Sequence, residues 1–573
     1  MKKTSLEKVI EAIETKQSFI LEAGAGSGKT YTLIQSLNYI LNKHSNDLSI
    51  SGGKIACITF TNVAKDEIIE RTENSNLVVV QTIHVFLWDC IKNYQSALHK
   101  KIEELNKEYE RQRTEEMKRK GYEYIENLEE ITKNINISYT EYGRNFQKGL
   151  LTHEDIILIS YYMFRDYPSL SNIVANKYPY LFIDEYQDTE KETIESILDH
   201  HLKLQKEKIV IGFFGDSMQK IYDKGVGKIN SKYYEENSEE KLLRFITKEE
   251  NYRSSLSVIN LLNNIRKDLT QEASGENKKN EGKISYLYGK NDYNDYFKYL
   301  KKQGWNFEDS DTKVLFLTHT GIAKNLGYEN LLKTYSKRYG QFGRDRLFKK
   351  EERFSKFFLD EKGVENIVRC YEFKEYGEVI NLLQKAGYEL TFHEDKEKIQ
   401  KMISELNNIR NTQTLGNVFS YIKEKKLMTI PDKILEFENY INQKEVDEEY
   451  KETHTKDKNF YNELMQINYN EFVSVYNFIE DKTIFSTKHG TKGGEYENVL
   501  VIIDDGAWKQ SYSFKEMFLG ESEYPERLQR TLNLFYVCCS RAKSKLAVAS
   551  VSDMTGATKT IKEWFGEKNV CEI

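Results

Sequence analysis

A glycine-rich segment near the amino terminus, LEAGAGSGKTYTL (residues 21–33), constrains the fold more than any other part of the chain. The apolar run SFILEA (18–23) leads into it and predicts a buried strand, whereas TYTLIQSLNYILNK (30–43) follows it with a helical pattern. A strand, a glycine-rich turn and a helix in this order are typical of an α/β domain with a parallel sheet. Ligands of such domains lie at the carboxyl ends of the strands.

The residue types in this turn indicate that it binds phosphate. Gly24, Gly26 and Gly28 allow the backbone to direct its N–H groups toward an anion. Lys29 offers a compact positive charge, and the Thr30 hydroxyl can ligate Mg²⁺. We therefore interpret the turn as a phosphate-binding loop for a nucleotide. Because kinases, GTPases, transporters and motors all use such loops, the loop alone leaves the activity open.

Further strands are predicted by short β-branched runs, each followed by a turn and a helical pattern. These runs are KIACITF (54–60), LVVVQTI (77–83), YLFIDE (180–185), IVIGFFGD (209–216), KVLFLTH (313–319), VLVIID (499–504) and KLAVASV (545–551). Strands that alternate with helices favour largely parallel sheets. Since the runs fall into an amino-terminal and a carboxyl-terminal group, we expect an α/β fold with two such domains.

Two stretches with a different pattern interrupt these domains. Residues 88 to about 150 include the highly charged segment HKKIEELNKEYERQRTEEMKRK (99–120), which predicts a solvated helix with i,i+4 ion pairs. Residues 331 to about 470 also have a mostly helical pattern. We expect both stretches to be insertions into the α/β domains.

Composition restricts the class of protein. The chain has 573 residues and a formal net charge of −6, which argues against a uniformly basic nucleic-acid coat but allows a local basic channel. No apolar run approaches the roughly 18 residues of a membrane span. The six cysteines form no CxxC pair, so we interpret them as reduced thiols. We expect a cytoplasmic protein that has no membrane partner.

Polar residues elsewhere complete the predicted nucleotide site. The apolar run in LFIDEYQDT (181–189) delivers Asp184, which would hold Mg²⁺ through bound waters, and Glu185, which would polarise an attacking water. Gln219 can hydrogen-bond a terminal phosphate, and Arg541 can reach the same group from the second domain. Taken singly, Gln219 would be interpreted as part of a polar turn and Arg541 as a surface ion-pair residue, so their assignment to the site depends on the other segments.

Taken together in chain order, eight segments resemble the helicase motifs of the UvrD/PcrA/Rep family of superfamily one. The segments are AGAGSGKT (23–30), ITFTNVAKDEIIER (58–71), QTIHVFLW (81–88), DEYQDT (184–189), GDSMQKIY (215–222), NYRSS (251–255), STKHGTKGGEYENV (486–499) and LFYVCCSRA (534–542). The resemblance implies two RecA-like P-loop motor domains with two mostly helical inserted accessory domains. It also implies that ATP and Mg²⁺ bind in the cleft between the motor domains, and that single-stranded DNA crosses them.

The resemblance also implies domain boundaries. The first, ATP-binding motor domain would comprise residues 1–87 and 152–247, with a helical insertion at 88–151. The second motor domain would comprise residues 248–330 and 471–573, with a helical insertion at 331–470.

Roles of single residues at the ATP site follow from the same resemblance. The implied nucleotide-binding residues are Ala23, Gly24, Ala25, Gly26, Ser27, Gly28, Lys29, Thr30, Tyr31, Tyr252, Arg253, Glu495 and Arg541. The implied catalytic residues are Lys29, Asp184, Glu185, Gln219, Arg253 and Arg541, with Thr30 and Asp184 as metal ligands. Tyr252 would stack on adenine, and Glu495 would contact the ribose. Arg253 and Arg541 would contact the γ-phosphate from the second domain.

DNA contacts are implied at a second set of positions. These are Phe60, Thr61, Asn62, Thr82, His84, Phe86, Tyr222, His489 and Lys492. Aromatic faces stack on bases without reading them, and hydroxyl or amide groups hold phosphates, so this binding would be tolerant of sequence. For Phe86 and Trp88, packing in the core is an equally good interpretation.

The chain also departs from the family pattern. Tyr31 replaces an arginine of UvrD and Rep and is more similar to the RecB/AddA branch, and Leu532 and Asn533 stand where the family carries arginines. DKGVGK (223–228) replaces the usual segment after the third motif, and Gln17 is the nearest counterpart of the glutamine that reads adenine. No long extension follows the sixth motif, so we expect no nuclease domain of the RecB/AddA kind.

Two functional hypotheses follow. The first is an ATP-dependent single-stranded DNA translocase and 3′–5′ DNA helicase that acts at junctions of single-stranded and double-stranded DNA. The second is an ATP-dependent DNA-end sensor or regulatory subunit that gates a partner nuclease and unwinds little, since helicases of this kind occur beside nucleases in Gabija-type antiviral systems. A small-molecule kinase is disfavoured because it would not need the second domain.

Overall fold

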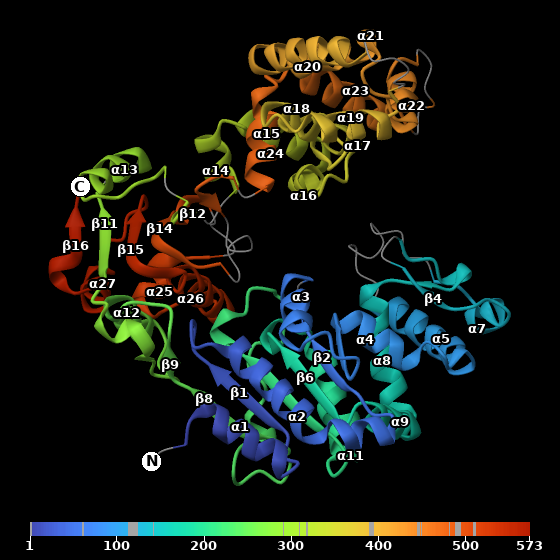
Figure 1. The fold of residues 1–573 in the computed structure, drawn as a ribbon, viewed down its shortest axis with the longest axis vertical. Helices are drawn as coiled ribbons and strands as arrows, with labels where there is room; N and C mark the ends of the chain where they lie inside the picture. The colour runs from blue at the N-terminus through green and yellow to red at the C-terminus, as the bar shows by residue number, and fades with distance from the viewer. Residues whose placement is uncertain are drawn as a thin grey trace.

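The computed structural model describes two α/β units and a helical region that extends from the second unit (Figure 1). It describes residues 3–573 with the exception of 60–61, 113–123, 141–142, 290–291, 309, 317–318, 389–394, 444–446, 448–449, 481, 487–493 and 508–511.

The first unit is built on a six-stranded parallel sheet with the strand order β3-β2-β6-β7-β1-β8. Its strands are β1 (Phe19–Ala23), β2 (Ile55–Ile58), β3 (Val78–Gln81), β6 (Tyr180–Asp184), β7 (Val210–Gly215) and β8 (Arg244–Lys248). Alternate residues of β1 enter opposite cores, with Phe19 and Leu21 on one face and Ile20 on the other. This two-sided burial explains why the central strands are continuous apolar runs.

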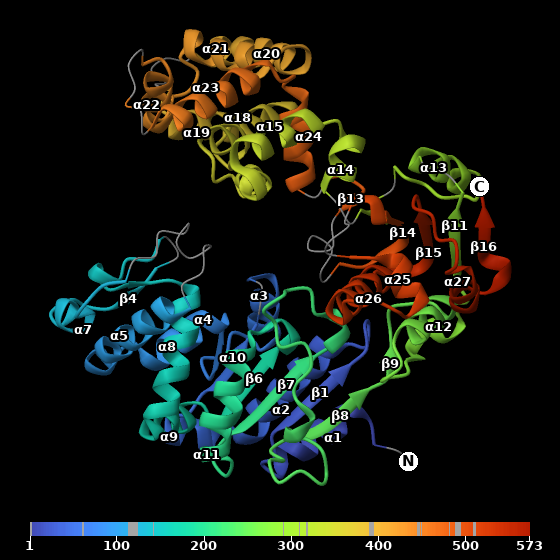
Figure 2. The ribbon, with the colours of Figure 1, turned by 180° about the vertical axis from the view of Figure 1, so that it is seen from behind.

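Helices cover both faces of the first sheet (Figures 1 and 2). They include α1 (Ser5–Glu14), α2 (Lys29–Ser51), α3 (Asn62–Arg71), α9 (Pro168–Lys177), α10 (Lys191–Glu195) and α11 (Lys203–Gln205). The core beneath α1 and α2 contains Val9 and Leu33 together with one face of β1. The carboxyl end of β1 and the start of α2 therefore meet at one edge of the sheet.

An accessory lobe lies at the side of the first sheet, as both views show. It contains α4 (Ile83–Ile91), α5 (Gln95–Arg111), α7 (Leu128–Thr132), α8 (His153–Asp166) and the short strands β4 (Ser138–Tyr139) and β5 (Leu150–Leu151). The charged segment forms a helix where it is described, in α5. The short strands β4 and β5 pair with each other within this mostly helical lobe.

The second unit repeats the parallel arrangement, with the strand order β13-β12-β14-β15-β11-β16. Its strands are β11 (Lys283–Tyr288), β12 (Thr312–Phe316), β13 (Phe485–Ser486), β14 (Tyr496–Ile503), β15 (Ala542–Ser550) and β16 (Val570–Glu572). Its helices are α12 (Leu256–Ile265), α13 (Tyr293–Lys302), α25 (Phe514–Leu519), α26 (Pro525–Cys539) and α27 (Thr558–Phe565). The small strands β9 (Glu250–Asn251) and β10 (Glu272–Ala273) pair near the connection between the two units.

A bundle of helices is inserted between β12 and β13. It comprises α14 (His319–Leu326), α15 (Glu329–Tyr339), α16 (Gly343–Phe348), α17 (Arg353–Leu359), α18 (Val364–Glu372), α19 (Tyr376–Lys385), α20 (Asp395–Thr412), α21 (Leu415–Lys425), α22 (Asp432–Ile441), α23 (Lys451–Gln466) and α24 (Asn470–Ile479). Its core is continuous with one face of the second sheet. Among the described helices, none has both the length and the apolar character that crossing a membrane requires.

All eight sequence-predicted strand runs form strands. In the two six-stranded sheets the sequence did not predict β8, β11, β13 and β16, and outside them it did not predict the two-residue strands β4, β5, β9 and β10. β8 (RFITK) contains only two apolar residues, and β13 and β16 are only two and three residues long. Such strands carry little local signal, because neighbouring strands provide most of their stabilisation.

Candidate nucleotide and DNA site

The glycine-rich loop joins β1 to α2 in the geometry that its residues predict. Gly26 and Gly28 have φ values of 69° and 74°, in the left-handed region that glycine adopts without strain. Gly28 caps the amino terminus of α2, so the loop opens toward the positive end of that helix. The buried Ser27 hydroxyl has no hydrogen-bond partner among the described residues. The Ser27 hydroxyl is thus available to an anion.

A cavity of about 670 Å³ lies against this loop, within the roughly 300–1,000 Å³ of small-molecule sites. It is lined by Thr4, Ser5, Leu6, Gly26, Ser27, Gly28, Tyr31, Thr32, Lys248, Glu250, Tyr252, Arg253 and Glu495. Tyr31 and Tyr252 are 56% and 54% exposed, so both rings are accessible to a base. The cavity size, the glycine-rich loop and the accessible rings fit a nucleoside triphosphate.

Sequence reasoning missed the amino-terminal and β8 residues of this cavity. Thr4 to Leu6 lie in no quoted motif, and Lys248 ends a strand that was not predicted. The suggestion that Gln17 reads adenine is corrected by the fold. Gln17 precedes β1, whereas the phosphate loop follows the other end of that strand. The length of the strand separates Gln17 from the nucleotide cavity.

Lys29 is neutralised by the acidic residues that end β6. Its ammonium nitrogen lies 2.5 Å from Glu185 Oε1 and 4.0 Å from Asp184 Oδ1. Burial acts to lower the pKa of Lys29, but the two carboxylates outweigh it and raise the pKa above its ordinary value. Gln187 Nε2 donates to the other oxygen of Glu185 at 2.5 Å. The three predicted residues are therefore together, with the lysine charge paired internally.

Gln219 and Arg541 join the two units. Arg541, at the carboxyl end of α26, is 1% exposed, and its Nη2 donates to Gln219 Oε1 at 2.9 Å. Burial and the nearby Arg253 guanidinium lower the pKa of Arg541 to about 10. Gln219 Nε2 donates to Asp216 Oδ2 at 2.7 Å. An arginine 322 positions away along the chain thus contacts the glutamine that follows β7.

Arg253 and Glu495 form an ion pair at the edge of the cavity. Arg253 Nε lies 2.7 Å from Glu495 Oε2, and Arg253 Nη1 donates to the Ser540 carbonyl at 3.2 Å. Burial acts to raise the pKa of Glu495, but Arg253 and Lys543 hold it below its ordinary value. Arg253 and Glu495 therefore line the nucleotide cavity as a compensated pair.

The second unit also holds the peptide groups of Ala25. The Ala25 N–H donates to Tyr536 Oη at 3.1 Å, and the Ala25 carbonyl accepts from Asn251 Nδ2 at 2.9 Å and Gln271 Nε2 at 2.8 Å. Asn251 and Tyr536 lie inside quoted motifs, which is the signal that reveals them. Gln271 lies in no motif. These bonds link the loop conformation to the placement of the second unit.

Some predicted DNA contacts lie outside the described residues, namely Phe60, Thr61, His489 and Lys492. For Asn62, the structure gives the backbone position at the start of α3. These five assignments stay predictions from the motifs.

The predicted DNA contacts on α4 divide into two groups. Phe86 is 2% exposed, and its ring centroid lies 5.5 Å from that of Tyr178 in the core. This burial corrects the assignment of Phe86 to DNA. Thr82 caps α4 and is partly exposed. His84 is also partly exposed, with its ring 4.5 Å from His153; burial and that neighbour lower its pKa to about 4, so the ring is neutral at pH 7.

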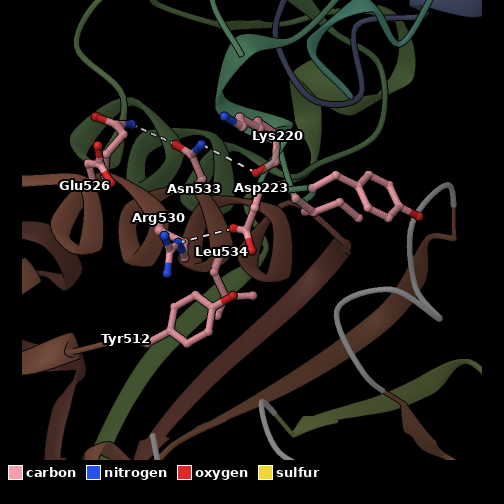
Figure 3. Close-up of a pocket in the computed structure, with 10 residues that line it drawn as sticks. Lys220, Asp223, Tyr512, Glu526, Arg530, Asn533 and Leu534 are labelled. Carbon is pink, nitrogen blue, oxygen red and sulfur yellow. Dashed lines mark hydrogen bonds and ion pairs between the residues drawn. The ribbon is translucent and has the colours of Figure 1, made fainter. Parts of the chain in front are cut away.

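Tyr222 lies at a second cavity, of about 300 Å³, between the two units (Figure 3). The cavity is lined by Lys220, Ile221, Tyr222, Asp223, Tyr512, Glu526, Gln529, Arg530, Asn533 and Leu534. Arg530 pairs with Asp223 at 3.4 Å, and Asn533 Nδ2 lies 3.5 Å from the Lys220 carbonyl oxygen. Asn533, a departure from the family pattern, thus contacts the first unit. Tyr222 is 39% exposed and accessible to a base.

Comparisons with known proteins agree with this geometry. Residues 6–224 match the AAA domain family, and this range contains the phosphate loop, Asp184 and Gln219. The chain is 26% identical to the ATP-dependent DNA helicase PcrA of Staphylococcus epidermidis (strain ATCC 35984), over 45% of this chain and 39% of that protein. Over this part the chain is therefore similar to the UvrD/PcrA-like superfamily-one helicases, and the similarity includes the phosphate loop.

A second relative matches over nearly the whole chain. The Gabija protein GajB of Bacillus cereus (strain HuB5-5) is 27% identical, and the alignment covers 98% of this chain and 97% of that protein. The match to PcrA of Staphylococcus aureus (strain Mu50) is 24% identical and again covers 45% of this chain and 39% of that protein.

Proposed function

We propose that the chain is a DNA-dependent ATPase that serves as the DNA-sensing, regulatory subunit of a Gabija-type antiviral system and gates a partner nuclease. The observation that carries this choice is the alignment with GajB over both chains, whereas the PcrA alignments stop at less than half of each chain. The comparisons thus favour the second hypothesis over the helicase that the sequence analysis put first.

We also propose that the two parallel sheets are RecA-like motor domains and that ATP and Mg²⁺ bind between them. The insertions would extend slightly beyond the boundaries given above, to include α4 and α8 in the accessory lobe and α14 and α24 in the bundle. ATP and Mg²⁺ would supply a cleavable phosphoanhydride bond and a bound divalent charge. Thr30 and Asp184 would be the metal ligands, and Tyr31 and Tyr252 would flank the base. The cavity and the unpartnered Ser27 hydroxyl that lines it support this assignment.

Hydrolysis would depend on an exchange of partners by charged side chains of this chain. Lys29 would move from Glu185 to the phosphates, which frees the Glu185 carboxylate to polarise a water. Arg253 and Arg541 would contact the γ-phosphate from the second unit, so the cleft closes with ATP and reopens after hydrolysis. Such differential contacts shift a two-state hinge, and this shift would be the signal to the nuclease.

A phosphate-release assay with and without single-stranded DNA tests the proposal. We expect DNA to stimulate hydrolysis and Lys29→Ala to reduce it by at least about 100-fold, because the outer phosphates lose their cation. Lys43→Ala, on the exposed part of the same helix, is the matched control and should hydrolyse normally. Hydrolysis that is indifferent to DNA would refute the proposal.

Unwinding remains the second candidate function, supported by the contact of Arg541 with Gln219 across the units. Opening a base-pair step costs about 1.4 kcal/mol on average. A strand-displacement assay on tailed DNA and RNA duplexes with both tail polarities separates the candidates. Displacement from 3′-tailed DNA would establish a 3′–5′ helicase. ATP turnover without displacement would favour the sensor.

A further inference from the structure

Arg266, the residue that follows α12, extends from the second unit into the first. Helix α12 packs against α26, α27, β11 and β15, so it belongs to the second unit. The guanidinium is 1% exposed and contacts Glu22 and Asp216, which end β1 and follow β7 of the first sheet. Its Nη1 lies 2.9 Å from Asp216 Oδ1 and donates to the Ala23 carbonyl at 3.1 Å.

These contacts compensate charges that water does not reach. Glu22 and Asp216 are 3% and 1% exposed at their side chains. Removing one partner of a buried ion pair is strongly destabilising, because the remaining charge stays desolvated. The planar fork of arginine contacts both carboxylates at once, which a lysine ammonium cannot match. Arg266 therefore compensates two carboxylates next to the phosphate loop.

Asp216 transmits this contact to Gln219. Its Oδ1 accepts from Arg266 and its Oδ2 accepts from Gln219 Nε2 at 2.7 Å. With its amide nitrogen held, Gln219 presents Oε1 to Arg541 Nη2 at 2.9 Å. Arg266, Asp216, Gln219 and Arg541 thus form one chain of hydrogen bonds, with an arginine of the second unit at each end.

A second branch of the network anchors it to the acidic motif. Glu22 Oε2 accepts from Tyr186 Oη at 2.5 Å, and Glu22 Oε1 accepts from the Ser217 hydroxyl at 2.7 Å. Burial raises the pKa of Asp216 to about 6, and the Arg266 charge opposes that rise. Arg266 thus favours the ionised carboxylate that accepts from Gln219 at neutral pH.

We propose that Arg266 is a positioning residue for ATP hydrolysis, which acts through Asp216 to orient the Gln219 amide toward Arg541. The proposal rests on the proposed ATPase function of the same cleft. The role of Arg266 differs from those proposed for Arg253 and Arg541. Arg266 contacts Asp216 and strand β1, which leads into the phosphate loop, instead of the γ-phosphate. Nothing in the motif comparison assigns a role to this position.

The steady-state kinetics of Arg266→Met and Arg266→Lys test the proposal. We expect Arg266→Met to lower kcat for ATP by about 10- to 100-fold with KM changed by less than about threefold, because orientation rather than binding is lost. Arg266→Lys should recover part of kcat. Arg266 Nε also pairs with Asp268 Oδ1 at 2.8 Å. Lys228→Met, which removes the lysine that pairs with Asp268 at 3.5 Å, is the matched control and should retain wild-type kcat.

A double-mutant cycle with Gln219→Ala separates positioning from a structural role. If Arg266 acts through Gln219, Arg266→Met should add little to the loss in the Gln219→Ala protein. Additive losses, or wild-type kcat in a folded Arg266→Met protein, would overturn the proposal. If Arg266→Met does not fold by circular dichroism, the same cycle with Arg266→Lys decides. Absence of DNA-stimulated hydrolysis in the wild type would instead refute the proposed function.

Discussion

At the scale of single residues, Glu185 combines a charged side chain with an unfavourable backbone conformation. Its φ is 52°, in the left-handed region, where a residue other than glycine costs about 1–3 kcal/mol. Lys29 and Gln187 bind its two carboxylate oxygens and hold it in place. The strained backbone therefore belongs to the residue that is proposed to polarise water. The turn directs the Glu185 carboxylate toward Lys29 of the phosphate loop.

Two substitutions at Glu185 separate strain from chemistry. Glu185→Gln and Glu185→Gly should both lower ATP hydrolysis by at least about 100-fold, because each removes the base. The glycine protein should be the more stable of the two by about 1 kcal/mol, since glycine adopts this φ freely. Calorimetric melting provides the comparison. Lys374, with a φ of 61°, is the control: Lys374→Gly should stabilise without changing hydrolysis.

A buried histidine predicts how stability depends on pH. His201 is 2% exposed, and burial lowers its pKa to about 4. Between pH 6.5 and 4 the unfolded chain binds a proton that the folded chain does not. Stability is therefore fully present above pH 6.5 and falls as the pH decreases toward 4, by on the order of 3 kcal/mol from this group.

Melting temperatures at pH 7 and pH 5 test this dependence. His201→Leu should reduce the loss of stability on acidification. Ser171→Ala, which removes the hydrogen-bond partner of the ring at 2.8 Å, should lower stability similarly at both pH values. An unchanged acid dependence in His201→Leu would show that other groups cause it.

At the scale of elements, the loop between β1 and α2 is shaped by the second unit as well as by its own glycines. A Cβ at Gly24 would lie 2.2 Å from Gln271 Nε2, and a Cβ at Gly26 would lie 2.6 Å from the Arg253 Cβ. Gln271 and Arg253 both precede β11, on the connection that leads into the second unit. Close approach across the interface therefore requires glycine at both positions.

The two glycines should respond differently to a compensating change. Gly24→Ala should lower kcat/KM for ATP by about 10- to 100-fold, because it displaces Gln271 from Ala25. Adding Gln271→Ala should restore part of that loss, since the methyl group then has room. Gly26→Ala should not be rescued, because its φ is 69° and its neighbour is a Cβ. Full activity of Gly24→Ala would contradict the close packing.

At the scale of the whole molecule, the proposed ATP site is assembled from both units, so we expect nucleotide state and unit placement to be coupled. Arg541, Arg266 and Tyr536 each contact the first unit from the second. The helical bundle shares its core with the second sheet. A change in the placement of that sheet would therefore also move the bundle, which is a route from ATP hydrolysis to a bound partner.

A reconstitution with the partner nuclease tests this coupling. Cleavage of DNA by the complex should respond to ATP with the wild-type chain and lose that response with Lys29→Ala, because the switch needs phosphate contacts. The nuclease assayed alone with the same nucleotide is the control. Equal responses with the wild-type and Lys29→Ala chains would show that gating does not use this site.

The local parts of this protein are predictable from its residue pattern. Apolar runs predicted eight strands, and glycine spacing predicted the phosphate loop, because burial on both sides and left-handed turns restrict residue type locally. The order of the motifs along the chain predicted that Lys29, Glu185, Gln219 and Arg541 belong to one site. These features depend on neighbours in the chain or on segments that carry their own pattern.

The contacts between the two units, in contrast, become visible only in the folded chain. Arg266 and Gln271 lie in no motif, yet each contacts the strand or loop of the phosphate site more than 240 positions away. Phe86 sits in a motif but packs in the core. Contacts of this kind follow from how two sheets pack together. A buried ion pair has no sequence period, so its partners are revealed only when the fold places them in contact.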